Sequence, residues 1–445
     1  MNTESSHATP KWYKKHRTIL TGCFFLAILV AITIGSEVLQ NRSNESSTQT
    51  LSTVDSAIAS TTDKLAENSN SATQRINLCQ AYLQKVRETA DSSYYDKCDP
   101  LLTKALSIEP SNAEVLATQA SVAYGRHNFT RGLELSQKAL LINPNRPAYY
   151  GLVSDGQIEL GQYSVAAASV QTMVNKQPNL NSFNRVAYIR ELYGDITGAK
   201  SALNRAVSSG SSFSENIAYS QVELAKLTAR SNLGEAKSIY SRALNTQKDY
   251  APALEGLGRI AFAEGDYSKA LSYFDQAYKE LPIAQYATGL GATYSAQGNK
   301  TKASQQYYLA TLAFDKSSSG GVDNDFEKAV FLTDQGKDLD TANKLAKKAL
   351  EKRPNLFTYD ALAWNFYKKG DFTQAQTNIQ EALKFGLSQP IINYHAGMIA
   401  EKLGQNEQAK TYLQKAFSED KYFLETHFSL KDKKFADEAR KRINQ

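Results

Sequence analysis

The sequence predicts an all-α fold, a solenoid of about ten helix–turn–helix units behind a single N-terminal transmembrane helix. Small residues recur about every 34 positions over most of the chain. Each interval contains two apolar helical patterns separated by a turn, and residues 18–35 form an apolar stretch without charge. Of the 445 residues, 42% are hydrophobic and 22% are charged, which is typical of a folded protein.

The N-terminus has the pattern of a membrane anchor. Residues 1–17 form a basic tail, and the apolar stretch 18–35 would span about 27 Å as a helix, enough to cross a hydrocarbon core. Because the Lys and Arg residues precede the stretch, we expect a cytoplasmic N-terminus and an extracytoplasmic remainder. The alternative is a signal peptide whose cleavage would give a secreted protein.

Residues 36–72 are predicted to form a flexible tether. They are rich in Ser, Thr, Asn and Gln and contain few large apolar residues, so they offer little surface to bury. Within them, "VDSAIASTTDKLAE" has a weak amphipathic pattern that indicates a short helix near the membrane.

Residues 73–421 form the predicted array. Asp195, Asp266 and Asp371 each follow a glycine at the turn between two helical patterns, and we expect them to cap the second helix. One small residue per unit marks the repeat, at spacings of 34, 34, 33, 37, 34, 33, 39, 33 and 34. These markers are Cys98, Gly132, Ala166, Ala199, Ala236, Ala270, Ala303, Ala342, Ala375 and Ala409.

Units such as "GLGRIAFAEGDYSKALSYFDQAYKELP" resemble the tetratricopeptide repeat. The resemblance implies a right-handed superhelix whose first helices line a concave face. It also places the G-x-G-x-x-A sequence beginning at Gly256 inside a helix, where it cannot form a nucleotide-binding turn. The segments "NRVAYIRELYGDITGAK", "ALAWNFYKKGD" and "YHAGMIAEKLG" are similar to a group of bacterial membrane-linked or secreted proteins of this kind, which have no established activity.

The array departs from its repeat at several places. The first unit has a longer connection between its helices, and the fifth lacks the turn glycine at "RSNLGEA". The 39-residue spacing marks an insertion at "FDKSSSGGVDNDFEK", whose Ser/Gly run we expect to loop out. Residues 422–445 lie beyond the last repeat and are predicted to form a polar capping helix.

The sequence indicates neither an enzyme nor a cofactor protein. Its five His residues are scattered, and neither a metal-binding H-E-x-x-H motif nor a catalytic G-x-S-x-G or phosphate-binding P-loop motif is present. We therefore predict no catalytic residue, cofactor or metal. Residues 18–430 carry no net charge, so nucleic acid is not an expected partner.

Cys79 and Cys98 fall on the two predicted helices of the first unit. Outside the cytoplasm they would be able to form a disulfide that fastens the end of the array. The alternative is two buried small residues, since Cys98 is itself a repeat marker. Both interpretations stay open at this stage.

The concave face is the predicted binding site. By analogy with the family, its aromatic and charged residues would recognise a protein or peptide partner, although many of them would instead pack against a neighbouring repeat. A glycan or envelope polymer is the alternative ligand, because sugar rings stack on aromatic faces. His395, next to this face, is interpreted as a hydrogen-bonded core histidine. The predicted groove residues are Tyr124, Asp155, Tyr188, Glu191, Glu255, Arg259, Phe262, Asp360, Trp364, Tyr367, Tyr394 and Met398.

Overall fold

The computed structural model describes residues 53–387, 389–427 and 441. Within these ranges the chain consists of 22 helices, α3–α24, without a β-strand, which confirms the all-α prediction. The predicted tail and membrane segment, residues 1–35, lie outside the described residues, as does most of the predicted capping helix. Among the helices that are described, none has the length and apolarity needed to cross a membrane.

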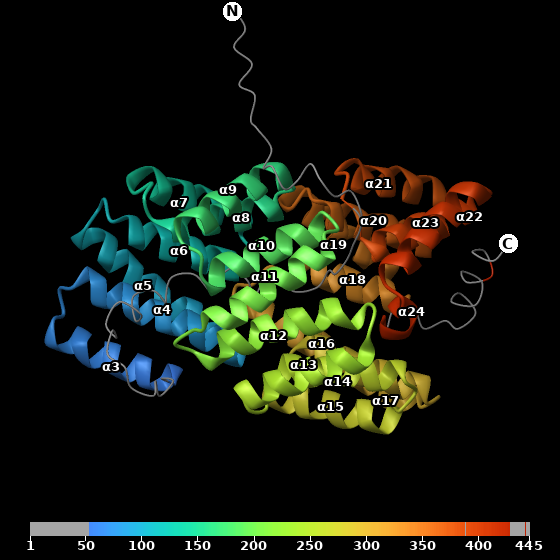
Figure 1. Ribbon diagram of the computed structural model, residues 1–445, viewed down its shortest axis with the longest axis horizontal. Coiled ribbons are helices and arrows are strands. Elements are labelled where there is room, and N and C mark those ends of the chain that lie inside the picture. The colour runs from blue at the N-terminus through green and yellow to red at the C-terminus, as the bar shows by residue number, and fades with distance from the viewer. Residues whose placement is uncertain (1–52, 388, 428–440, 442–445) are drawn as a thin grey trace, which may run out of the picture.

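Ten helix–turn–helix pairs follow one another along the chain, flanked by α3 (Val54–Glu67) and the short α24 (Phe423–Thr426) (Figure 1). The solenoid prediction is thereby confirmed. The pairs are α4 (Ala72–Thr89) with α5 (Ser93–Ile108), α6 (Ala113–Gly125) with α7 (Phe129–Ile142), α8 (Pro147–Glu159) with α9 (Tyr163–Lys176), α10 (Leu180–Leu192) with α11 (Ile196–Ser209), α12 (Ser214–Ala229) with α13 (Leu233–Thr246), α14 (Ala251–Ala263) with α15 (Tyr267–Glu280), α16 (Ala284–Ala296) with α17 (Lys300–Ser319), α18 (Asp325–Gln335) with α19 (Leu339–Lys352), α20 (Leu356–Lys369) with α21 (Phe372–Lys384), and α22 (Pro390–Lys402) with α23 (Asn406–Glu419).

The repeat markers lie on the second helix of each pair, where they are buried. Their small side chains leave room for an aromatic ring between the helices. Phe274 on α15 is completely buried, and a Cβ atom added to Gly258 or to Gly289 would lie 2.8 Å from its ring. In this pair a large ring therefore packs on small residues of the adjacent helices.

Local signals also set the helix boundaries. Asp195, Asp266 and Asp371 each accept a hydrogen bond from the backbone N–H three residues ahead, as expected for helix caps. The glycine before each aspartate has a φ angle of 78°, 79° or 82°, in the left-handed region that glycine adopts most easily.

Two segments that the sequence predicted as a loop and a flexible tether contain helix in the structure. The expected Ser/Gly loop is wrong in part: α17 continues through Ser319, whose hydroxyl donates to the carbonyl of Asp315, and only residues 320–324 form a connection. In the predicted tether, the amphipathic pattern forms α3 over its full length. Val54 at its start is buried, and an ion pair between Asp55 and Lys85 joins the helix to α4.

The array curves until repeats far apart in sequence touch. Figure 1 shows the α20–α21 pair next to α9 and α10, and one hydrophobic cluster contains Ile158 and Ile189 from the earlier helices together with Leu356 and Trp364 from α20. The second half of the chain thus packs against the first half, which determines how much of the concave face stays accessible.

Candidate functional site

Most of the predicted groove residues are buried. Trp364 is only 5% exposed and Tyr394 only 1% exposed. Tyr188 on α10 and Arg259 on α14 keep part of their side chains in contact with solvent. The other buried members are Tyr124, Asp155, Glu191, Glu255, Phe262, Asp360, Tyr367 and Met398.

Charged groove residues pair with each other or with neighbouring helices. Asp155 on α8 accepts two hydrogen bonds from Arg185 on α10, at 2.9 and 2.6 Å, and both side chains are buried. Glu191 on α10 pairs with Arg230, the residue that ends α12. Such pairs satisfy buried charges and hold adjacent first helices in a defined register.

Tyr124 packs between helices instead of lining a groove. Its hydroxyl donates to the carbonyl of Leu152 at 2.8 Å. Cβ atoms added to Gly132 or Gly156 would lie 2.3 Å from this side chain, so the two glycines make the space that it fills. This residue follows the alternative interpretation, packing against the neighbouring repeat.

The structure brings together four groove residues at the C-terminal end. Asp360 contacts Nδ1 of His395 at 2.8 Å, and the His395 ring stacks on Trp364 with the ring centroids 3.9 Å apart. Tyr367 stacks on the indole at 4.5 Å, and Tyr394 lies at 6.2 Å from it. His395 is therefore a hydrogen-bonded core residue, as interpreted from the sequence.

Burial also changes the acidity of carboxyl groups in this interior. Burial raises the pKa of Asp334 to about 7, although the charge of Lys368 and the Trp364 indole act to lower it. The pKa of Glu191 is also raised by burial, against the effect of Arg230. The interior of the superhelix is therefore a poorly hydrated environment in which charge is costly.

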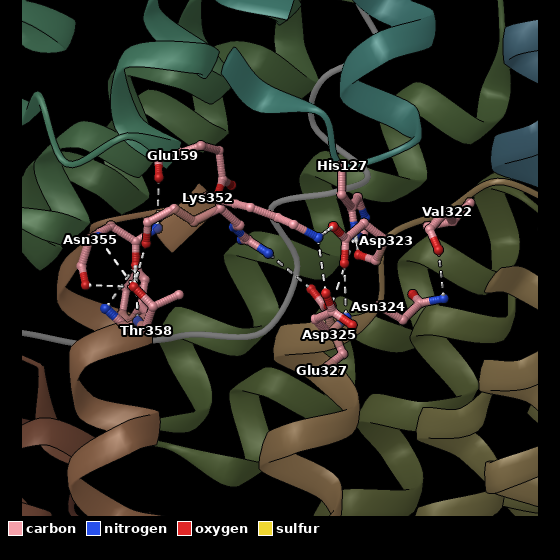
Figure 2. A network of polar contacts seen from close by, with 12 residues as sticks. His127, Glu159, Val322, Asp323, Asn324, Asp325, Glu327, Lys352, Asn355 and Thr358 are labelled. Carbon is pink, nitrogen blue, oxygen red and sulfur yellow. Dashed lines mark hydrogen bonds and ion pairs between the residues drawn. The ribbon is translucent and has the colours of Figure 1, made fainter. Parts of the chain in front are cut away.

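The two turns of the superhelix meet along a polar surface, which we call the inter-turn seam. It comprises residues 126–127 and 159–163 on one turn and residues 321–327 and 352–358 on the other. His127 Nδ1 lies 2.7 Å from the Asp323 carbonyl, and the Asp323 N–H donates to the Arg126 carbonyl at 3.1 Å. Figure 2 shows Lys352 reaching between Asp323 and Asp325.

A buried ion pair anchors the other end of the seam. Arg353 donates to Glu159 from Nη2 and Nε, at 2.6 and 3.1 Å, across 194 residues of sequence. The Asn355 side chain donates to the Glu159 carbonyl at 2.8 Å. The carbonyl of Pro354 approaches Gly161 so closely that an added Cβ would lie 2.5 Å away. These contacts join the α8–α9 turn to the α19–α20 connection.

Several residues that join distant repeats were not predicted as functional, yet they coincide with departures from the repeat. Arg230 stands in the fifth unit where the turn glycine is missing, and its carbonyl accepts the N–H of Lys421. Asp323 lies in the insertion. His127 has a φ angle of 60°, so a non-glycine residue adopts the left-handed conformation that glycine has in other repeats. Departure from the repeat is thus the sequence signal for contact between turns.

A cleft of about 730 Å³ borders the seam between α5, α6, α7 and residues 321–323. The buried residues Leu102 and Phe129 line it, together with the cations Arg126 and Lys352. Both cations are engaged: Arg126 pairs with Asp96 and Asp99, and Lys352 pairs with Asp323 and Asp325.

Cys79 and Cys98 form a disulfide that joins α4 to α5. Both cysteines are fully buried, so the bond also fills the small-residue position between the helices. Elsewhere in the part of the chain that the structure describes, no group of three or more His, Cys, Asp or Glu side chains is arranged to hold a metal ion.

Comparison with known families and structures agrees with the repeat architecture. Tetratricopeptide repeat families match residues 227–284, 256–319 and 391–422. No curated protein matches the sequence. Tetratricopeptide-repeat proteins are generally scaffolds rather than enzymes.

Solved helical-repeat structures are similar to this chain at low sequence identity. The Cut9–Hcn1 hetero-tetramer of the APC/C has 13% identity over 88% of this chain and 93% of its own, with a TM-score of 0.37. Yeast Tom70 has 14% identity, coverages of 88% and 97%, and a TM-score of 0.38. The human IFIT1 dimer with m7Gppp-AAAA has 14% identity, coverages of 75% and 77%, and a TM-score of 0.46. The family matches and the ten helix pairs support the tetratricopeptide-repeat superfamily for this chain.

Proposed function

We propose that this protein is a membrane-anchored scaffold whose repeat array binds a protein or peptide partner on its concave face, outside the cytoplasm. The observation that supports it most is the stack of ten helix pairs, because such folds generally bind protein or peptide partners. Two residues of the proposed face, Tyr188 on α10 and Arg259 on α14, remain partly exposed.

The anchor and the compartment are supported by separate features. Residues 18–35 are apolar and follow a basic tail, as in a signal anchor. The disulfide between Cys79 and Cys98 supports an oxidising compartment, because disulfides rarely persist in the cytosol of mesophiles. A secreted form released by cleavage would share the compartment but would lack the anchor.

No specific observation favours the glycan alternative. Trp364 and Tyr394, the rings that sugar stacking would use, are almost completely buried. A protein partner that contacts the exposed parts of Tyr188 and Arg259 does not need access to Trp364 or Tyr394. We therefore give preference to a protein or peptide ligand.

Site-specific photo-crosslinking tests the proposal. A photoreactive phenylalanine analogue would replace Tyr188 on the concave side in one variant and Tyr308 on α17 in the matched control, since Tyr308 is 63% exposed. We expect a discrete protein adduct in native membranes from position 188 and none from position 308. An adduct from position 308 alone would move the site away from the concave face, and no adduct from either would refute the scaffold proposal.

A further inference from the structure

The residues after the last repeat pair cross the array and contact helices about 170 to 190 residues earlier. We call Asp420–His427, which includes α24, the C-terminal segment. The N–H of Lys421 donates to the Arg230 carbonyl at 2.9 Å, and Arg259 Nη1 donates to the Thr426 carbonyl at 3.2 Å. Both bonds involve the main chain of the segment, so they do not depend on its side chains.

The side chains of the segment fill an apolar site. Phe423 is completely buried, with its ring 5.6 Å from that of Tyr394 and 6.5 Å from that of Phe417. Leu424 is buried beside it, and the His427 ring lies 4.3 Å from the Phe423 ring. One aromatic residue is thus the main apolar anchor of the segment.

Charge adds a second recognition element. The Asp420 side chain is buried, and burial raises its pKa to about 6, although the charge of Arg230 acts to lower it. One oxygen of this carboxyl group accepts a hydrogen bond from the backbone N–H of Tyr422 at 3.0 Å. Burial and the nearby charge of Arg259 lower the pKa of His427 to about 3, so this imidazole is neutral at neutral pH. The segment therefore presents an acidic group to Arg230 and a neutral ring to Arg259.

Two predicted groove residues, Arg259 and Tyr394, hold this segment. Main-chain hydrogen bonds combined with an anchoring aromatic side chain are features of peptide ligands. We propose that the C-terminal segment occupies the concave face as an intramolecular ligand, and that the scaffold's partner is a peptide of the same chemistry, with an acidic residue followed three positions later by an aromatic one. This inference rests on the proposed scaffold function.

Occupation by the chain itself would regulate binding. A tethered segment acts at an effective concentration in the millimolar range, so a free peptide with the same contacts competes poorly. Loss of the segment's anchor would make the site available. A segment that serves only as a structural cap would behave differently, because its loss would open the adjacent repeats and a separate peptide would not replace it.

Peptide binding to the full chain distinguishes the two roles. The probe is a fluorescent peptide with the sequence of residues 419–427, and anisotropy is measured with wild type, Phe423→Asp and the control Lys421→Ala, whose side chain is exposed. We expect Phe423→Asp to bind at least tenfold more tightly than wild type and Lys421→Ala to match wild type. Combining Arg259→Ala with Phe423→Asp should weaken peptide binding at least tenfold relative to Phe423→Asp alone. Replacing the phenylalanine of the peptide by serine should have an effect of the same size.

A second variant covers the case in which Phe423→Asp disturbs folding. Lys421→Pro removes the N–H that donates to Arg230, and Asp420 already has the extended backbone (φ −141°, ψ 101°) that precedes proline readily. Hydrogen exchange should then accelerate in residues 421–427 while α22 and α23 stay protected. Equal loss of protection in those helices, or no gain of peptide binding in either variant, overturns the proposal.

The outcome also separates this inference from the scaffold function. Combining Phe423→Asp with the photoreactive residue at position 188 should increase the yield of adduct several-fold. An unchanged yield would leave the scaffold intact and refute self-occupation. If Phe423→Asp increases binding of the fluorescent peptide but position 188 gives no adduct in native membranes, the result supports self-occupation and contradicts the proposed function.

Discussion

The repeat interiors and the inter-turn seam hold the molecule together by different contacts. Inside a pair, a ring such as Phe274 packs against small residues that recur about every 34 positions. Across the seam, Arg353 reaches Glu159 over 194 residues through charged hydrogen bonds. A solenoid with neighbour contacts alone behaves as a one-dimensional array, whereas the seam makes distant repeats depend on one another.

The largest expected effect tests the repeat interior. Phe274→Ala removes a completely buried ring between Gly258 and Gly289 and should lower the free energy of unfolding by about 3–5 kcal/mol. Urea unfolding followed by circular dichroism measures it, and hydrogen exchange should show the loss centred on α14–α17. Tyr308→Ala, at an exposed position, should change stability by less than about 0.5 kcal/mol. Equal effects of the two variants would contradict the packing described.

The seam should respond over a longer range. Arg353→Met leaves the Glu159 carboxylate buried without its main partner and should cost about 3 kcal/mol. Hydrogen exchange should then increase both at the α8–α9 turn and at the α19–α20 connection. Arg131→Met, which breaks an exposed pair with Glu134, is the matched control and should cost less than about 1 kcal/mol. Faster exchange near residue 353 alone would show that the turns are not coupled.

The disulfide should stabilise the first helix pair that the structure describes, α4 with α5. Replacing Cys79 and Cys98 together by alanine opens a 19-residue connection and should cost about 2–4 kcal/mol. Thermal unfolding of the double variant, compared with reduced and oxidised wild type, measures the contribution. If reduction leaves the transition of wild type unchanged, the cysteines act only as small core residues.

A smaller effect should depend on pH. Because the pKa of Asp334 is raised from 3.8 to about 7, its contribution to stability is full below pH 4 and is lost as the pH rises through 7. Asp334→Asn should therefore be more stable relative to wild type at pH 8 than at pH 5, by on the order of 1 kcal/mol. Replacing Trp12 by phenylalanine leaves Trp364 as the single tryptophan of the sequence. The fluorescence of Trp364 should then titrate near pH 7 when residue 334 is aspartate and should not titrate there when it is asparagine. A pH-independent difference would contradict this assignment.

The smallest effect separates backbone strain from seam contact at His127. Glycine relieves the left-handed φ angle of 60° but loses the contact with Asp323, so His127→Gly should be nearly neutral. His127→Ala keeps the strain, which wild type also carries, and loses the contact, at a cost of about 0.5–1 kcal/mol. Urea unfolding compares the two variants. Identical stabilities would show that strain at this turn is negligible.

Much of the local architecture was predictable because each unit carries its own signals. The markers, the turn glycines and caps such as Asp266 act within a single unit, and α3 coincides with its amphipathic pattern. The binding face was harder to judge. Trp364 and Tyr394 have the residue types of an exposed recognition surface, and nothing in their own repeats shows that other repeats bury them. His127, Arg230 and the insertion at Asp323 were the available clues, since each breaks the pattern where another turn of the chain makes contact.

The sequence by itself determined the helix pairs, their number and their stacking, because these follow from apolar spacing, small residues and caps within about 34 positions. The predicted membrane anchor is likewise a property of one continuous stretch. Only the tertiary structure decided that most of the predicted groove residues are buried and that Phe423 packs against one of them, Tyr394. Closure depends on small rotations that add up over successive repeats, and contacts about 194 residues apart leave no periodic signature in the sequence.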